Sequence, residues 1–164
     1  MVLEAPVPYP PDREARLTTV LNQVGGYGFT VPATWDVKED GRRTRVASAN
    51  GRTVITFGLG ASGEIEQTSA RLLDSLGESQ TDQTLIGSTW ERIGGSRSLL
   101  VSGTAADEEG RPVRFLAITI PGDSRNYAIT VSVPAHSDPV RVLLRLEKIV
   151  TSFQILESEE PTSQ

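Results

Sequence analysis

The sequence predicts an α+β domain, in which an antiparallel β-sheet of about six or seven strands is flanked by two to three α-helices as an α/β sandwich. Short turn sequences separate successive runs of β-branched and aromatic residues, which is typical of antiparallel strand pairs. Amphipathic stretches with helical spacing precede, interrupt and follow these runs. The length of 164 residues suits one domain, and the sequence contains no internal repeat.

Composition divides the chain into three parts. Residues 1–11 are rich in proline, which favours an extended linker over a helix. Residues 12–156 are expected to form the single α+β domain. Residues 157–164 are acidic or small, and they predict a disordered tail. A membrane anchor or another domain upstream of Pro6 is an alternative that the sequence leaves open.

The first element of the domain is predicted to be a helix. Asp12 suits its N-cap and Gly25 its C-cap. Between these two caps, apolar residues recur at helical spacing, at Leu17, Val20, Leu21 and Val24. We therefore expect a helix from Asp12 to Val24 with one face on the core.

Residues 26–35 predict a strand that stops at Pro32, followed by a turn that carries Trp35. The large side chains of this strand alternate and fall on one face, at Tyr27, Phe29 and Val31. The chain has few aromatic residues, and several of them gather here. We expect the core to begin at this strand.

A β-hairpin is predicted next. A polar turn over Lys38–Gly41 leads to a strand, Arg43–Ala49. The pair Asn50-Gly51 is a strong signal for a tight hairpin turn, and it connects this strand to a second one, Thr53–Leu59.

The middle of the chain predicts a helix over Glu64–Leu76 that stops at Gly77. Its apolar stripe consists of Ile65, Leu72, Leu73 and Leu76. Glu78–Thr84 reads as a polar loop, Leu85–Trp90 as a short strand, and Gly94-Gly95 as a turn.

Longer strands with turns between them come next, at Ser96–Ala106, Pro112–Ile120 and Asn126–Val133. Within Val113–Ile120 the apolar residues change from one face to the other. Either a bulge shifts the register, or the strand is central and covered on both faces.

A final helix is predicted to begin after His136, with Asp138 as N-cap and Pro139 at the first helical position. Its apolar stripe consists of Val142, Leu146, Ile149, Val150 and Phe153. The basic residues Arg141, Arg145 and Lys148 lie away from this stripe and read as an ordinary solvated face.

Composition narrows the classes of partner and chemistry. The net charge of -5 argues against nucleic acid, which requires a clustered basic surface. The absence of cysteine removes disulfides, thiolate metal sites and cysteine nucleophiles. No run approaches the roughly 20 apolar residues of a membrane helix, so direct membrane insertion is not expected. We expect no cofactor and no metal.

Three sequence patterns could indicate a catalytic, metal-binding or nucleotide-binding site, and each is a weak match. His136 is the only histidine, and we interpret it as an exposed loop residue without a catalytic partner. The acidic turn Asp107–Glu109 lacks the alternating ligands of a calcium loop. The glycines at 58, 60 and 63 have G-x-G-x-x-G spacing, but no parallel strand ending in an acidic residue follows the helix. We therefore predict a protein that is not an enzyme.

The two tryptophans, Trp35 and Trp90, allow two interpretations. In a small α+β domain a large aromatic residue usually lies in the core. Alternatively, the pair lines a groove for a ligand or a partner, because large aromatics often anchor binding surfaces. These two residues are the candidate site of the sequence.

The chain resembles the PsbP/Mog-type fold family. The resemblance rests on Phe29, Val31, Pro32 and Trp35, which match its "phe-x-val-pro-x-x-trp" opening, and on the closing Ser152-Phe153. It covers residues 26–155, with the same order of hairpin, helix, long antiparallel strands and final helix. The matched positions are structural, so the resemblance transfers no functional residue.

Members of this family act mainly as binding or assembly modules, and they include exported bacterial lipoproteins of the LpqN type. The resemblance therefore implies a non-enzymatic protein-binding or scaffolding domain of a bacterial cell-envelope or exported protein, with an unknown protein partner. The alternative is a small-molecule or lipid carrier with a pocket between the sheet and the helices. An extracytoplasmic or envelope location is expected, and the cytoplasm remains an alternative. The chain lacks the lipid-bearing cysteine of such lipoproteins.

Overall fold

The computed structural model describes residues 16–60, 62–136 and 146–156. A seven-stranded sheet contains β3 (Asp36–Asp40), β4 (Arg43–Ala47), β5 (Val54–Leu59), β6 (Thr81–Ile93), β7 (Ser96–Ala106), β8 (Pro112–Ile120) and β9 (Tyr127–Pro134). A three-stranded sheet contains β1 (Leu17–Asn22), β2 (Tyr27–Pro32) and β10 (Gln154–Ile155). The helices are α2 (Ile65–Leu76) and a segment over residues 146–151.

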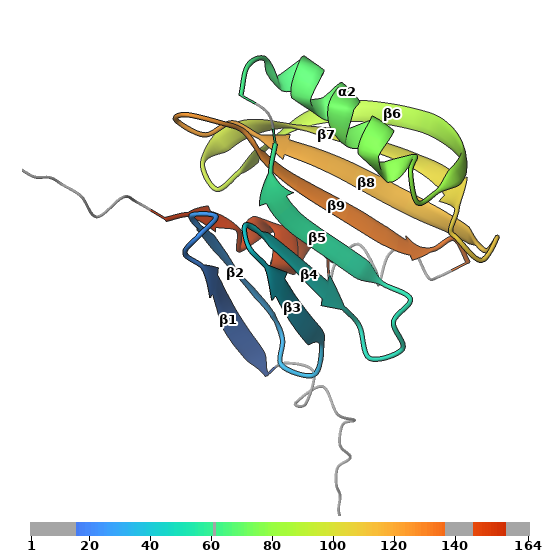
Figure 1. The fold of residues 1–164 in the computed structure, drawn as a ribbon, viewed down its shortest axis with the longest axis horizontal. Coiled ribbons are helices and arrows are strands. Elements are labelled where there is room, and N and C mark those ends of the chain that lie inside the picture. The colour runs from blue at the N-terminus through green and yellow to red at the C-terminus, as the bar shows by residue number, and fades with distance from the viewer. Residues whose placement is uncertain (1–15, 61, 137–145, 157–164) are drawn as a thin grey trace, which may run out of the picture.

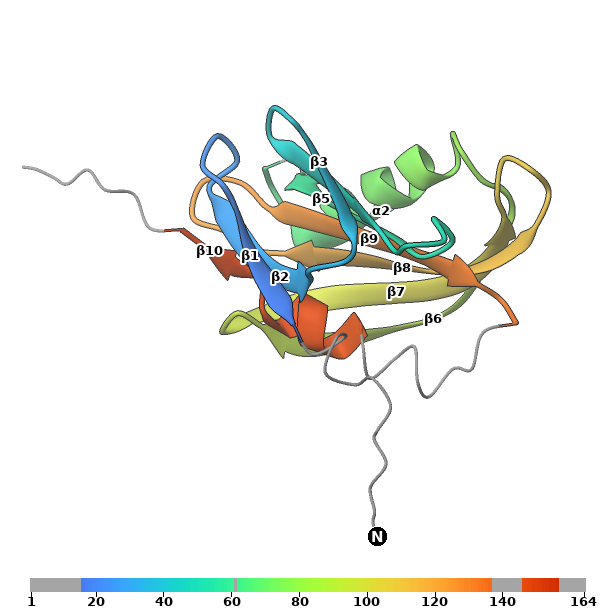
Figure 2. The same ribbon diagram turned by 90° about the horizontal axis from the view of Figure 1, so that it is seen from below.

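The order of the large sheet is β3-β4-β5-β9-β8-β7-β6, and that of the small sheet is β1-β2-β10. Each of these neighbouring pairs is antiparallel. Helix α2 covers one face of the large sheet, over β7 and β8 (Figure 1). The small sheet and residues 146–151 lie on the opposite face (Figure 2). The predicted α+β fold class is confirmed.

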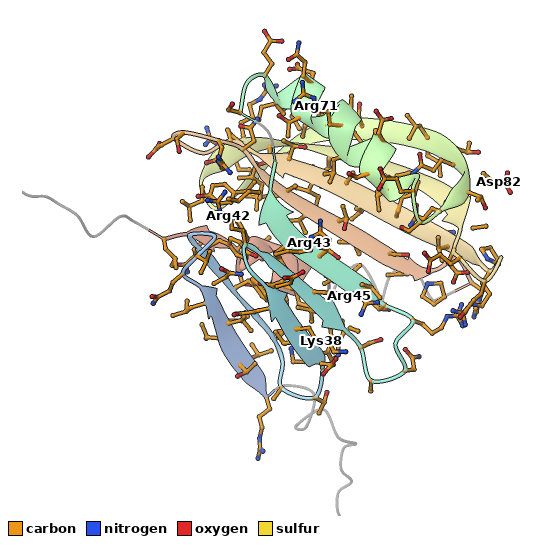
Figure 3. The ribbon with its side chains drawn as sticks, in the orientation of Figure 1. Lys38, Arg42, Arg43, Arg45, Arg71 and Asp82 are labelled. Atoms are coloured by element: carbon orange, nitrogen blue, oxygen red, sulfur yellow. The ribbon has the colours of Figure 1, made fainter. Side chains whose placement is uncertain are left out.

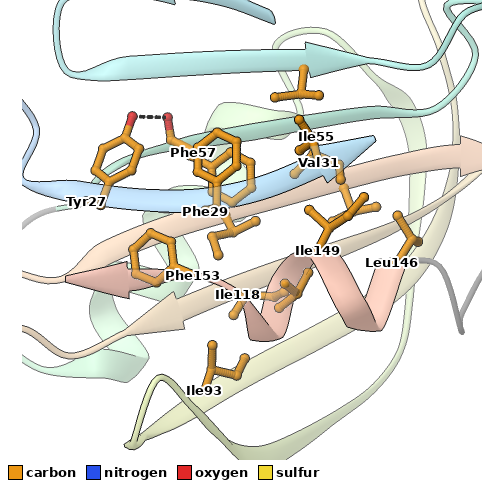
Figure 4. Packing of buried hydrophobic residues seen from close by; sticks show 14 of the residues in the cluster. Tyr27, Phe29, Val31, Ile55, Phe57, Ile93, Ile118, Leu146, Ile149 and Phe153 are labelled. Atoms are coloured by element: carbon orange, nitrogen blue, oxygen red, sulfur yellow. Dashed lines mark hydrogen bonds between the residues drawn. The ribbon is translucent and has the colours of Figure 1, made fainter. Parts of the chain in front are cut away.

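The main core fills the space between the small sheet and the large sheet. Tyr27, Phe29 and Val31 of β2 are at most 2% exposed, which confirms their predicted shared buried face. They pack against Ile55 and Phe57 of β5, and the helical segment completes the cluster (Figure 4). The predicted stripe of that segment is confirmed for its described members, Leu146, Ile149, Val150 and Phe153.

A second apolar layer lies between α2 and the other face of the large sheet. The strand residues are Leu99, Val101 and Ala105 of β7 and Val113, Phe115 and Ala117 of β8. The helix contributes Ile65, Leu72, Leu73 and Leu76, as its apolar spacing predicts. Gly77 ends the helix, also as predicted.

Strand β8 is central and is covered on both faces. Its register with β7 and with β9 runs without a shift from end to end. Ala117 faces the α2 layer, whereas its neighbours Ile118 and Ile120 face the main core. The change of apolar face in its sequence therefore reflects double burial, and no bulge is present in it.

The predicted helix from Asp12 to Val24 is wrong, because Leu17–Asn22 forms strand β1. All six residues of β1 pair with β2. Pairing satisfies backbone groups and places Val20 against the main core, so tertiary contacts override the helical spacing. Residues 1–15, which contain the predicted N-cap, lie outside the described part of the chain.

Two further expectations need correction. The predicted turn over Lys38–Gly41 is mostly strand, since β3 extends to Asp40 and the chain turns at Gly41 and Arg42. The predicted loop over Glu78–Thr84 ends early, because β6 begins at Thr81. Both strands are edge strands with exposed side chains, so neither carries the apolar alternation that marks a half-buried strand.

The predicted start of the last helix, at Asp138 and Pro139, and the predicted acidic tail lie outside the described residues. In the part of the chain that is described, no helix is both long enough and apolar enough to cross a membrane.

Candidate binding surface

The structure places the two candidate tryptophans in different layers. Trp35 is 9% exposed and belongs to the main core, directly after β2. Trp90 lies on β6, opposite Leu99 of β7, and packs at the margin of the α2 layer. The large sheet separates these two layers, so the structure does not bring the tryptophans together. Of the two, only Trp90 is near the surface.

Trp90 is half-buried and carries a cation on its ring. The guanidinium carbon of Arg97 lies 4.3 Å from the ring centroid, within the range of a cation–π contact. Both side chains lie on the α2 side of the sheet, where α2 packs mainly over β7 and β8. Trp and Arg are enriched among residues that dominate the energy of protein interfaces.

Two apolar side chains are exposed on the same edge strand. Leu85 is 56% exposed and Ile86 is 69% exposed. A register shift between Leu85 and Gly87 leaves Ile86 as the extra residue of a β-bulge. We call Leu85, Ile86, Trp90 and Arg97 the β6 surface.

No strand of the described part of the chain pairs with the outer edge of β6, and this edge lacks charge along much of its length. Residues 83–90 contain no Asp, Glu, Lys, Arg or Pro. Charged residues on an edge strand discourage strand pairing with another chain, and their absence here leaves backbone groups of β6 available. The ends of the strand are charged, at Asp82, Glu91 and Arg92.

The opposite edge of the large sheet, formed by β3, is highly charged. Strand β3 carries charged side chains at Asp36, Lys38, Glu39 and Asp40. Lys38 lies opposite Arg45 on the α2 side of the sheet, at the end far from the helix, and Figure 3 shows these side chains on the β3–β4 hairpin. Because this edge is short and charged, it is poorly suited to strand addition. Of the two edges of the large sheet, the β6 edge is therefore the better suited to pairing with a strand of another chain.

The acidic turn at Asp107 is a closed hydrogen-bonded loop. Asp107 accepts hydrogen bonds from the backbone N–H groups of Glu109 and Arg111, and its carboxylate pairs with the Arg111 side chain. The backbone hydrogen bond from Arg111 is the main cause that lowers the pKa of Asp107. Arg111 also pairs with Glu109. The carboxylates of Asp107 and Glu109 thus stabilise the turn that joins β7 and β8.

The glycine pattern at 58, 60 and 63 is part of a strand-to-helix connection. Gly58 lies in β5, which pairs antiparallel with β4 and β9, whereas a dinucleotide fold places this strand in a parallel sheet. The Gly60 N–H donates to the Asn126 carbonyl at 2.7 Å, and the Asn126 amide donates to the Gly63 carbonyl at 3.1 Å. The loop is thereby held against β9.

His136 is exposed at the end of the described segment 62–136. The basic residues Arg141 and Arg145 lie outside the described residues, and Lys148 is exposed. Among the described residues, no group of three or more His, Cys, Asp or Glu side chains is arranged to hold a metal ion.

Comparisons with known proteins show the fold. No protein-family model and no curated protein matches the chain. Cyanobacterial PsbP (CyanoP) from Synechocystis superposes with a TM-score of 0.62 at 13% identity, over 86% of this chain and 93% of that chain. LpqN, described as involved in cell envelope biogenesis of Mycobacterium tuberculosis, superposes with a TM-score of 0.56 at 13% identity, over 87% of this chain and 91% of that one.

A protein from Bacteroides thetaiotaomicron also matches, with a TM-score of 0.59 at 11% identity, over 90% of this chain and 50% of its own length. These likenesses confirm the PsbP-like fold that the residues Phe29 to Trp35 indicate. At such low identity they establish the fold alone.

Proposed function

We propose that this chain is a non-enzymatic binding or assembly domain of an exported or envelope-associated bacterial protein. Its partner in this role is another protein, which binds the β6 surface. The location is supported by the likeness to LpqN, which is described as a protein of cell envelope biogenesis. The binding role is supported by the surface itself.

The observation that carries the proposal is the exposure of Leu85 and Ile86 beside Trp90 on a free, uncharged strand edge. An extended partner segment can add a strand to such an edge, with backbone hydrogen bonds for affinity and side-chain contacts for specificity. Trp90 and Arg97 then provide the anchors on the α2 side of the added strand.

The alternative function, a carrier with an internal pocket, has less support. The space between the two sheets is occupied by large side chains that are almost fully buried, among them Phe29, Phe57 and Phe153. These rings lie in stacked contact with one another or with Tyr27. A ligand there would have to displace packed aromatic rings, whereas a protein partner at β6 requires no such change.

The proposal is tested by photo-crosslinking in the native envelope. A photoreactive residue at Ile86 is expected to give a discrete adduct with one protein, and the same residue at Lys38, on the opposite edge, is expected to give none. Ile86 is 69% exposed, so its replacement leaves stability within about 0.5 kcal/mol.

A second variant tests the anchor. Arg97→Glu, in the chain that carries the photoreactive residue, removes the cation from the Trp90 ring and is expected to abolish the adduct. Arg45→Glu, at an exposed arginine of β4 far from β6 in the sheet order, is the charge-matched control and is expected to retain it. Equal labelling from Ile86 and Lys38 would contradict the proposal.

A further inference from the structure

Within the described residues, the small sheet also has a free edge, and it belongs to β1. In the order β1-β2-β10, β1 pairs only with β2 among the described strands, and Figure 1 shows it at the rim of the molecule. Its six residues pair with β2 in an unbroken register. No charged residue occurs between Arg16 and Asp36, so this edge lacks the charges that protect β3.

The two faces of β1 differ in burial. Val20 and Asn22 point inward, where Val20 packs against the main core and Asn22 is 2% exposed. Leu17, Thr19 and Leu21 alternate with them and point outward. Leu17 is 57% exposed and Leu21 is 51% exposed. They are among six large apolar side chains that the described residues expose, and Val24, in the turn after β1, is another.

The sequence of β1 is self-complementary about Thr19. If a second β1 lies antiparallel with its Thr19 opposite the first, each Leu17 faces the Leu21 of the other copy. Thr18 then faces Val20, so outward residues meet outward residues and inward residues meet inward ones. Arg16 faces Asn22, and no like charges are opposed.

We propose that β1 pairs with β1 of a second copy of this chain, about a two-fold axis through Thr19. The paired small sheets then form one continuous antiparallel sheet with the order β10-β2-β1-β1-β2-β10. Such an interface is isologous, because each copy contributes the same patch. It covers the outward leucines and pairs the free backbone groups of both edges.

The match is specific to this register and to this occupant. A shift of the axis to Val20 places Leu21 opposite Thr19 and leaves Leu17 without an apolar partner. A different polypeptide would need its own leucines at the same spacing, whereas a second copy has them by symmetry. Because the interface consists of one strand edge, association is expected to be weak and to depend on protein concentration. This dimer is independent of the β6 surface, which lies at the edge of the other sheet.

The absence of cysteine permits a direct test of the register. Residues opposite each other in an antiparallel pair have Cα atoms about 4.5–5.5 Å apart, which suits a disulfide. Thr19→Cys is therefore expected to form a disulfide-linked dimer under mild oxidation. The matched control is Val24→Cys, a position that is also exposed but lies away from the axis, which is expected to cross-link at least tenfold more slowly.

The unmodified chain provides the second measurement. Sedimentation equilibrium is expected to show a monomer–dimer equilibrium. Thr19→Lys, which places two ammonium groups opposite each other at the axis, is expected to weaken it at least tenfold. Val24→Lys is expected to leave it unchanged, and circular dichroism checks that both variants fold.

Three outcomes would overturn the proposal. One is equal cross-linking rates for Thr19→Cys and Val24→Cys, and another is a dimer that survives Thr19→Lys. The third is a chain that stays monomeric at every concentration measured. Slow solvent exchange of the outward-facing β1 amides in that monomer would show that another segment of the same chain covers the edge.

Discussion

The ring of Phe29 in β2 lies parallel to the ring of Phe57 in β5, with the centroids 3.7 Å apart and the planes inclined by 9°. The two residues come from different sheets, so this contact joins the small sheet to the large one. Phe153, at the end of the helical segment, lies with its ring centroid 6.1 Å from that of Phe57. Phe57 is thus a contact point for three elements of the fold.

Phe57→Ala is expected to lower the free energy of unfolding by about 3–5 kcal/mol, because it removes a fully buried ring and leaves a cavity between the sheets. Urea denaturation followed by circular dichroism measures this loss. Val24→Ala, at a side chain that is 70% exposed, is the control and is expected to change stability by no more than about 0.5 kcal/mol. A loss for Phe57→Ala as small as that of the control would show that the rings are not packed as described.

Tyr27 gives the fold a dependence on alkaline pH. Its hydroxyl lies 2.7 Å from the Arg42 carbonyl oxygen and 3.1 Å from that of Phe57, and either can accept its hydrogen bond. Asn22 donates to the hydroxyl oxygen. Burial is the main cause that raises the pKa of Tyr27 above its ordinary value of 10.0.

Because the folded state resists ionisation of this phenol, its contribution to stability is full below pH 10.0 and is lost as the pH rises above that value. Tyr27→Phe is expected to cost about 1–3 kcal/mol at neutral pH, since buried polar groups lose a partner. It is also expected to flatten the decline of stability above pH 10.0. Unfolding free energies measured from pH 7 to pH 11 test both, and an unchanged alkaline decline would contradict the assignment. Burial also raises the pKa of Tyr127, so part of the decline is expected to remain.

Gly103 in β7 has no room for a side chain. A Cβ atom there would lie 2.6 Å from the Phe115 ring, and it would also meet the Thr84 carbonyl oxygen. Gly103→Ala is therefore expected to cost about 1–3 kcal/mol through overpacking. Gly87→Ala, on neighbouring β6, is the matched control, because nothing lies within 4 Å of its added Cβ. Thermal unfolding of the two variants should separate them clearly, and equal melting temperatures would contradict the close approach.

Asn126 secures the start of α2. Glu64 occupies the N-cap but makes no side-chain capping bond. The Asn126 amide instead donates to the Thr68 hydroxyl at 2.8 Å. Asn126→Ala is expected to cost about 1–3 kcal/mol and to speed amide exchange in the first turn of α2. Gln67→Ala, at an exposed position of that turn, should do neither. Unchanged exchange in the Asn126 variant would show that other contacts hold the helix.

Strands bounded by clear turn signals were predictable from the sequence. The bounds of β7 and β8 agree with the predicted strands Ser96–Ala106 and Pro112–Ile120. The Asn50-Gly51 turn connects β4 and β5 as predicted. In these segments the local pattern and the tertiary environment favour the same structure.

Strand β1 shows why other segments could not be predicted. Its apolar residues satisfy the spacing of a helix, whereas the run Thr18-Thr19-Val20 is β-branched and favours a strand. The decision comes from β2, which offers a partner for every residue of β1. Pairing with the neighbouring strand is not contained in the sequence of the segment itself.

The candidate site was predictable only in part. The sequence identifies Trp90 as a residue of a type that anchors interfaces, and Trp90 lies at the β6 surface. Trp35, chosen for the same reason, is in the main core. The sequence predicts only that Leu85 and Ile86 belong to a short strand, because exposure of an apolar residue depends on what covers it. That information exists only once α2 is known to lie over β7 and β8.

The small sheet is assembled from the two ends of the described chain. Strand β10 pairs with β2, and the Thr30 N–H donates to the Ser152 hydroxyl across 122 positions of sequence. During synthesis, the β1–β2 hairpin emerges early but cannot obtain these contacts until residues 152–155 have followed. Contacts of such long sequence separation slow folding, because the chain must close a large loop before they form. Among the described elements, the β1–β2 hairpin is therefore made early but completed late, because the small sheet closes only after residues 152–155 have left the ribosome.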